Sequence, residues 1–177
     1  WRRVFDALKC EPRFVLCLRD PRAALVEMQI TEDLSAPAAE LAWIGHHLDA
    51  VLRTGGRLHV FRWESWHRDR RSYLARLESL LGADDEVQVV EQPPAPGLDE
   101  HEHPAVDVAR KDGELSVVTR ELYRALTGFA AGAVSSDELL AYATDLRDQA
   151  AELPVPPDSL AFLHGRLTSA RRGLARS

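Results

Sequence analysis

The residue best placed for chemistry is Arg19, which lies between an apolar run at residues 14–18 and the pair formed by Asp20 and Pro21. The run has the length of a buried strand, and the spacing after Pro21 is helical, so Arg19 is expected where a strand meets a helix N-terminus. Ligands of open α/β sheets bind at the carboxyl ends of the strands, and a guanidinium beside a helix N-terminus suits a phosphate group. The sequence therefore predicts an anion site at Arg19. The alternative is an ion pair between Arg19 and a nearby carboxylate, Asp20 or Glu27.

A second group of residues has the chemistry of metal ligands but lacks their usual spacing. His101 and His103 are separated by one residue, whereas catalytic zinc sites on helices use two histidines four residues apart. The stretch is also rich in proline and charge, which is typical of a solvated acidic loop. We therefore expect no metal site among Asp99, Glu100, His101, Glu102, His103 and Asp107.

Two pairs of ring-bearing residues are further candidates. Trp63 and Trp66 flank Glu64 at the expected end of a strand, where they could stack on an adenine. The favoured interpretation is a hydrophobic plug on which the next helix docks. His46 and His47 fall within an expected helix, and we interpret them as surface or core histidines without a catalytic role.

The elements that must position these residues follow from periodicity and from turn residues. Apolar runs indicate strands at residues 13–18 and 57–62, with a possible third strand at residues 87–90, and a turn is expected at residues 63–67. Because helices join the first two strands, a parallel pair in one sheet is expected. Cys17, inside the first run, is expected to be a buried thiol. Helical stripes are expected over residues 2–9, 21–28, 38–53, 73–81, 115–126, 139–146 and 160–167.

These elements predict an α/β portion over residues 1–90 and a helical C-terminal extension over residues 109–177. A proline-rich linker or loop over residues 91–108 separates them. The α/β portion should carry a short parallel sheet.

Composition limits the class of protein. The 177 residues are 45% hydrophobic, with a net charge of −6. This balance is typical of a globular chain and argues against nonspecific nucleic-acid binding, which depends on excess basic charge. No apolar run approaches the ~18 residues of a membrane helix. Two cysteines give no disulfide framework, so a reducing cytoplasm is expected.

The segment from the first strand to the fourth helix resembles part of the sulfotransferase family, whose members use 3′-phosphoadenosine 5′-phosphosulfate (PAPS). Arg19, Asp20 and Pro21 resemble its 3′-phosphate element, an apolar strand followed by Arg-Asp/Asn-Pro and a helix. Residues 59–66 and the helix ending at residues 80–82 resemble its later strand, turn and helix. Trp43 lies between these motifs, as a tryptophan often does in bacterial members. The likeness covers residues 12–82.

This resemblance implies a three-layer α/β/α fold of the P-loop-like type with a short parallel sheet. It also implies transfer of a sulfuryl group from PAPS to a hydroxyl or amine of a small-molecule or glycan acceptor. Arg19 would then contact the 3′-phosphate of the nucleotide. Arg110, Lys111 and Gly113 faintly resemble a second 3′-phosphate motif, but the tryptophan expected nearby is absent.

The departures from the family pattern are equally specific. Glu27 stands where the family has a phosphate-binding serine, and a carboxylate repels a phosphate. The family's phosphosulfate loop and catalytic base belong upstream of Arg13, and the chain begins at Trp1 rather than Met. We therefore expect these residues to be the later part of a longer protein, inactive alone. The alternative is a non-catalytic module that retains the fold beside another enzyme domain.

Overall fold

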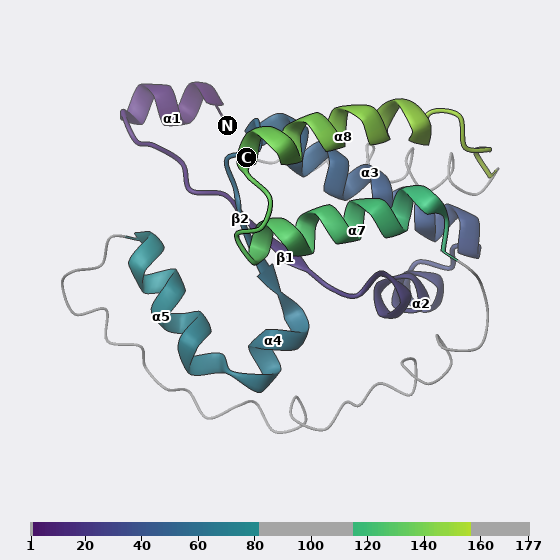
Figure 1. The fold of residues 1–177 in the computed structure, drawn as a ribbon, viewed down its shortest axis with the longest axis horizontal. Helices are drawn as coiled ribbons and strands as arrows, with labels where there is room; N and C mark the ends of the chain where they lie inside the picture. Colours follow the sequence, from purple (N-terminus) through teal and green to yellow (C-terminus); the bar gives the residue numbers. More distant parts are fainter. Residues whose placement is uncertain (1, 82–114, 157–177) are drawn as a thin grey trace, which may run out of the picture.

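The computed structural model describes residues 2–81 and 115–156, which form an α/β arrangement that is mostly helical. Its only sheet among these residues has two strands. Figure 1 shows α7 and α8 side by side, α4 at the end of β2, and α5 leading away from α4. The elements are α1 (Arg2–Leu8), β1 (Val15–Leu18), α2 (Pro21–Thr31), α3 (Ala36–Thr54), β2 (His59–Arg62), α4 (Trp63–Arg68), α5 (Arg70–Leu81), α7 (Val117–Ala130) and α8 (Ser136–Ala150).

The two strands confirm the predicted parallel pair. Leu16 lies opposite Val60, and Leu18 lies opposite Arg62. Along β1 the side chains alternate between exposed and buried, as expected when one face of a strand meets the core. The prediction of a buried Cys17 is wrong, because Cys17 belongs to the exposed set and carries a free thiol.

Local signals in the sequence explain how the two strands are joined. Asp20 caps α2, and Pro21 takes the first position of that helix. Ser35 caps α3 by accepting a hydrogen bond from the backbone N–H of Ala38. Gly55 ends α3 with a φ of 62°, a left-handed conformation that glycine adopts without strain. The chain then turns back so that β2 runs beside β1.

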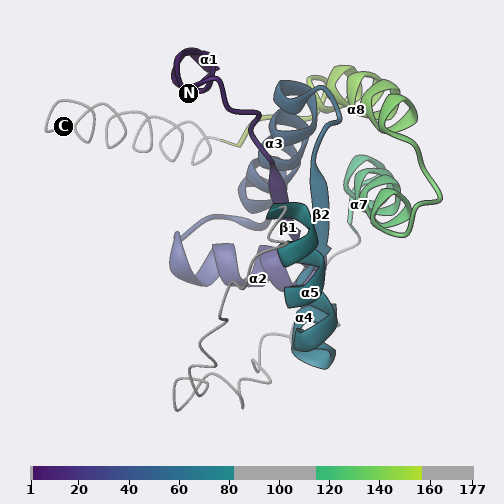
Figure 2. The same cartoon turned by 90° about the vertical axis from the view of Figure 1, so that its left-hand side faces the viewer.

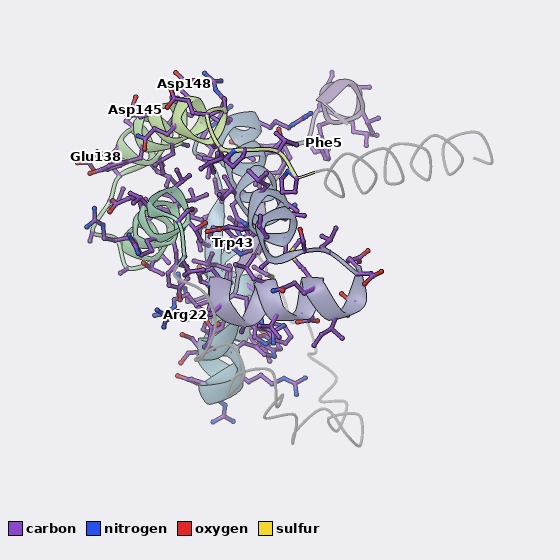
Figure 3. All side chains as sticks on the ribbon, turned by 90° about the vertical axis from the view of Figure 1, so that its right-hand side faces the viewer. Phe5, Arg22, Trp43, Glu138, Asp145 and Asp148 are labelled. Atoms are coloured by element: carbon purple, nitrogen blue, oxygen red, sulfur yellow. The ribbon has the colours of Figure 1, made fainter. Side chains whose placement is uncertain are left out.

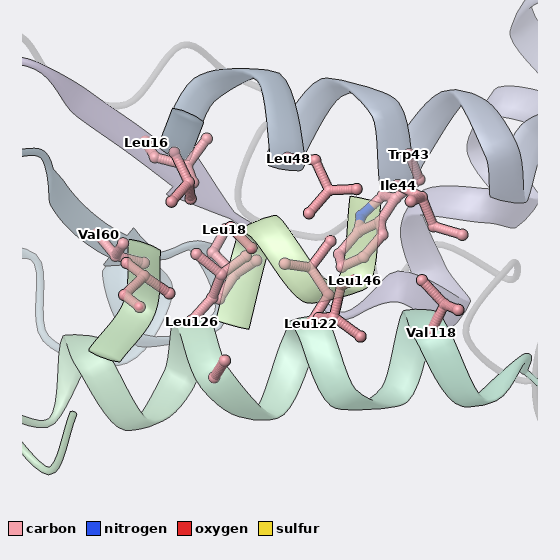
Figure 4. Packing of buried hydrophobic residues seen from close by; sticks show 14 of the residues in the cluster. Leu16, Leu18, Trp43, Ile44, Leu48, Val60, Val118, Leu122, Leu126 and Leu146 are labelled. Atoms are coloured by element: carbon pink, nitrogen blue, oxygen red, sulfur yellow. The ribbon is translucent and has the colours of Figure 1, made fainter. Parts of the chain in front are cut away.

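The core lies between the buried face of the sheet and three helices. In Figure 4, Trp43 and Leu48 of α3 and Leu122 and Leu126 of α7 point toward each other. Leu18 of β1 belongs to the same buried cluster and is fully buried. The predicted C-terminal extension therefore shares one core with the α/β portion in the described residues.

A polar link also joins the first part of the chain to the later helices. Glu40 of α3 accepts a hydrogen bond from the backbone N–H of Ser116 at 2.8 Å and another from the hydroxyl of Thr119 at 2.6 Å. Thr119 is completely buried, so this carboxylate satisfies a hydroxyl that water does not reach. The link fixes the start of α7 against α3.

On the opposite face of β2, Phe61 contacts α5. Phe61 points away from Val60 along the strand, and its ring centroid lies 5.2 Å from that of Tyr73. The Tyr73 hydroxyl accepts a hydrogen bond from the backbone N–H of Arg62 at 3.0 Å.

The prediction of a turn at residues 63–67 is wrong, because these residues belong to the short helix α4. Figure 2 shows α4 and α5 at the end of β2, away from α8.

Several predicted features lie outside the described residues: the strand at 87–90, the proline-rich stretch and its metal-ligand candidates, the motif with Arg110, and the helix at 160–167. The helices predicted over residues 115–126 and 139–146 are confirmed, as parts of α7 and α8. None of the helices within residues 2–81 and 115–156 has the length and apolar content needed to span a membrane.

Candidate functional site at the carboxyl edge of the sheet

Arg19 lies where the sequence predicted it, directly after β1 and before the N-terminus of α2. The Asp20 side chain accepts a hydrogen bond from the backbone N–H of Arg22 at 2.9 Å. The Asp20 carbonyl accepts another from the N–H of Ala24 at 3.0 Å. Because Pro21 has no N–H, these bonds leave few backbone N–H groups of the first turn of α2 without an acceptor.

A second element holds this turn in place. The backbone N–H of Asp20 donates to Oε1 of Glu64 at 2.7 Å. The parallel register explains the contact: Leu18 lies opposite Arg62, so the residues two positions further along each chain also meet. Glu64 lies in the first turn of α4. The two strand-to-helix turns that resemble sulfotransferase motifs are therefore directly hydrogen-bonded to each other.

The guanidinium of Arg19 forms an ion pair with the carboxylate of Glu27. Glu27 follows two turns into α2, which brings its side chain back toward the start of the helix. The Arg19 side chain is 24% exposed and the Glu27 side chain 44% exposed. The structure thus contains the ion pair given above as the alternative for Arg19. As arranged, the Glu27 carboxylate occupies Nη1 of Arg19 and would repel a phosphate group placed beside it.

The sequence did not point to two residues at this edge. Arg62 ends β2, and Tyr123 reaches the same edge from α7. Burial raises the pKa of Tyr123, the negative charges of Asp20 and Glu64 raise it further, and Arg62 acts in the opposite direction through its charge and a side-chain hydrogen bond. A tyrosine within an otherwise apolar helical stripe was the available signal. Its position at this edge depends on the packing of α7 on β2.

The two predicted aromatic residues have different surroundings. Trp66 makes an edge-to-face contact with Tyr73, with ring centroids 6.2 Å apart, and Arg70 lies over its ring at 5.4 Å. These contacts agree with the interpretation of Trp66 as a plug for the following helix. Trp63 is 44% exposed at the start of α4.

The two neighbouring histidines are surface and core residues, as predicted. His46 is exposed and His47 is buried. The His47 ring stacks on Trp43 at 4.1 Å between centroids, and its Nδ1 lies 2.7 Å from the Trp43 carbonyl oxygen. Burial lowers the pKa of His47 to about 4; the backbone hydrogen bond acts against this shift, and the charge of His46 adds to it. His47 is therefore neutral at neutral pH.

Metal binding finds no support in the described part of the chain. Within residues 2–81 and 115–156, no three His, Cys, Asp or Glu side chains are grouped so that they could hold a metal ion. The acidic side chains labelled in Figure 3, Glu138, Asp145 and Asp148, lie spread along α8.

Comparisons of this chain with protein-family models, with curated proteins and with solved structures found no match. The features that bear on function are therefore the geometry of the sheet edge and the motifs in the sequence.

Proposed function

We propose that this chain is the 3′-phosphate side of a sulfotransferase-like protein with a three-layer α/β/α fold. The whole protein would transfer a sulfuryl group from PAPS to an acceptor hydroxyl or amine, in the cytoplasm. The observation that supports this most is the pairing of the Arg19 turn with the Glu64 turn at one sheet edge. Both motifs of the sequence resemblance meet there, and this contact supports the proposal of a shared nucleotide site.

In this proposal the chain's own residues bind and orient. Arg19 would neutralise a phosphate beside the N-terminus of α2, and the hydrogen bond from Asp20 to Glu64 would keep the two turns together. No residue of this chain is assigned as a catalytic base. We expect the chain alone to bind 3′-phosphoadenosine 5′-phosphate weakly and to lack transfer activity, because Glu27 already holds the guanidinium.

The second candidate is a non-catalytic module with the same fold. The ion pair between Arg19 and Glu27 favours it, since the pair gives Arg19 a structural role without a ligand. In this case the sheet edge would be a rigid feature of a binding or assembly domain, and nucleotide would have no effect on the chain.

Calorimetric titration with 3′-phosphoadenosine 5′-phosphate separates the two candidates. The chain is compared with Glu27→Ser, which restores the family's hydroxyl, and with Arg19→Ala in the Glu27→Ser background. Losing a donor and adding a negative charge each cost about 1–3 kcal/mol, so Glu27→Ser should tighten binding at least roughly tenfold. Arg19→Ala should abolish that gain.

The matched control is Asp49→Ser, which removes a carboxylate from a different ion pair, the one with Arg53 within α3. It should leave the titration unchanged. If Glu27→Ser gains nothing and Arg19→Ala changes nothing, Arg19 is not a phosphate ligand, and the module becomes the better description.

A further inference from the structure

We propose that Arg62 and Tyr123 form a second anion-binding pair at the carboxyl edge of the sheet, which takes the phosphate or sulfate group of a small molecule. This inference goes beyond the proposed function, because it does not require a nucleotide or a contribution from Arg19.

The placement follows from the strand register. Arg62 is the last residue of β2 and lies opposite Leu18. Because side chains alternate along a strand, Arg62 projects from the same face as Val60, the face on which α7 packs. Tyr123 follows the fully buried Leu122 on that helix. The two side chains meet where β2 ends, close enough for Arg62 to lower the pKa of Tyr123 against the effects of burial and of the nearby carboxylates.

The two arginines at this edge differ in their partners. Arg19 has the carboxylate of Glu27, whereas no ion pair of Arg62 occurs within the described ranges 2–81 and 115–156. In the same ranges the Nε atom of Arg62 is buried and has no hydrogen-bond partner. A buried guanidinium donor without an acceptor is costly, so an acceptor supplied by a ligand would relieve the cost. Arg62 is thus better prepared for an anion than Arg19.

Tyr123 complements this cation as a donor. Its raised pKa keeps the phenol protonated at neutral pH. When the Tyr123 oxygen accepts a hydrogen bond from Arg62, its own hydroxyl hydrogen remains able to donate to a third group. An arginine and a tyrosine hydroxyl together offer donors of the kind that phosphate and sulfate oxygens accept.

Two carboxylates act against anion binding here. Asp20 and Glu64 are close enough for their charges to affect Tyr123. Their repulsion should make the binding weak, and the attraction to Arg62 should decrease as ionic strength rises. A small oxyanion is therefore the expected ligand class, and inorganic sulfate and phosphate are suitable probes.

The competing explanation is that Arg62 and Tyr123 only fasten α7 to β2. Titration of the ¹⁵N-labelled chain with sodium sulfate, at constant ionic strength maintained with sodium chloride, tests both explanations. We expect sulfate to shift the backbone amide signals of residues 62–64 and 123. Arg62→Met, which keeps an apolar stem, should weaken this response at least tenfold, and Tyr123→Phe should weaken it severalfold.

Two further variants make the result decisive. Arg53→Met removes an exposed arginine on α3 and should leave the response intact. Arg19→Met should also leave it intact; loss of the response in Arg19→Met but not in Arg62→Met would overturn the inference while supporting the proposed function. The inference is also wrong if sulfate does not shift these signals in the unmodified chain. Tyr123→Phe removes only a hydroxyl, so it remains informative if Arg62→Met fails to fold.

Discussion

The carboxylate of Glu64 accepts a hydrogen bond from the backbone N–H of Asp20, with 2.7 Å between Oε1 and the nitrogen, although the two residues are 44 positions apart in the chain. The bond crosses from the end of β1 to the start of α4, and it lies beside the only two strands in the described residues. It couples the cap of α2 to the register of the sheet, so a change at Glu64 should affect the Arg19 turn.

Replacing Glu64 by alanine should lower the free energy of unfolding by about 1–3 kcal/mol, because the half-buried N–H of Asp20 loses its charged acceptor. Glu64→Gln keeps an oxygen in place and should cost less. Urea denaturation followed by circular dichroism measures both. Asp148→Ala, at an exposed carboxylate of α8, serves as control and should stay within about 0.5 kcal/mol of the unmodified chain. Equal stability of Glu64→Ala and the unmodified chain would contradict the coupling.

Glu40→Ala should destabilise the chain by about 1.5–3 kcal/mol, because a single carboxylate oxygen serves both Ser116 and the buried Thr119. Thr119→Val removes one of the two donors without changing the side-chain shape much. In a double-mutant cycle the two changes should show a coupling of about 0.5–3 kcal/mol. Additive effects, measured by chemical denaturation, would mean that Glu40 does not hold the start of α7 through Thr119.

Gly56→Ala should be destabilising, by about 1–3 kcal/mol or more, for two reasons. Gly56 has a φ of 72°, and an added Cβ would lie 2.7 Å from the carbonyl oxygen of Ser136 at the start of α8. Gly45→Ala is the matched control, since it lies within α3 and an added Cβ meets nothing within 4 Å. That change should stabilise the chain by about 0.5–1 kcal/mol. Thermal melts that rank the two variants in the reverse order would refute this prediction.

Stability should fall as the pH decreases from about 6.5 to about 4, partly through His47. Its pKa is about 4 in the folded chain against 6.5 for an ordinary histidine, so the unfolded chain binds more protons within this window. A shift of this size corresponds to about 3 kcal/mol. Urea denaturation at several pH values measures it as the difference between the unmodified chain and His47→Leu. His46→Gln, at the exposed neighbour, should retain the pH dependence, and a parallel pH profile for His47→Leu would contradict the assignment.

Local signals predicted much of this fold. Asp20 with Pro21, Ser35 and Gly55 act through the backbone next to them, so their roles as caps and terminators could be inferred without tertiary structure. The parallel pairing followed from two apolar runs joined by helices. The exposure of Cys17 could not be inferred in this way, because an apolar run does not reveal how many strands or helices cover its two faces.

The site was predicted in part for a similar reason. The sequence neighbours of Arg19 are enough to predict its place, and the pairing with Glu27 is one of the two outcomes that the sequence allows. The contributions of Arg62 and Tyr123 depend on the packing of α7 on β2, across more than 50 residues of chain. Such a contact leaves no local pattern in the sequence, because an arginine at the end of a strand and a tyrosine in a helix are both common.

The core shared by α3 and α7 has a consequence for synthesis. Ribosomes add about 5–20 residues per second, and domains fold in the order in which their parts emerge. When residues 2–81 have left the ribosome, Trp43, Ile44 and Leu48 still lack the apolar surface that Leu122, Leu126 and Leu146 provide later. The early segment must therefore wait, with part of its apolar surface in contact with water or a chaperone, until α7 and α8 arrive to cover it.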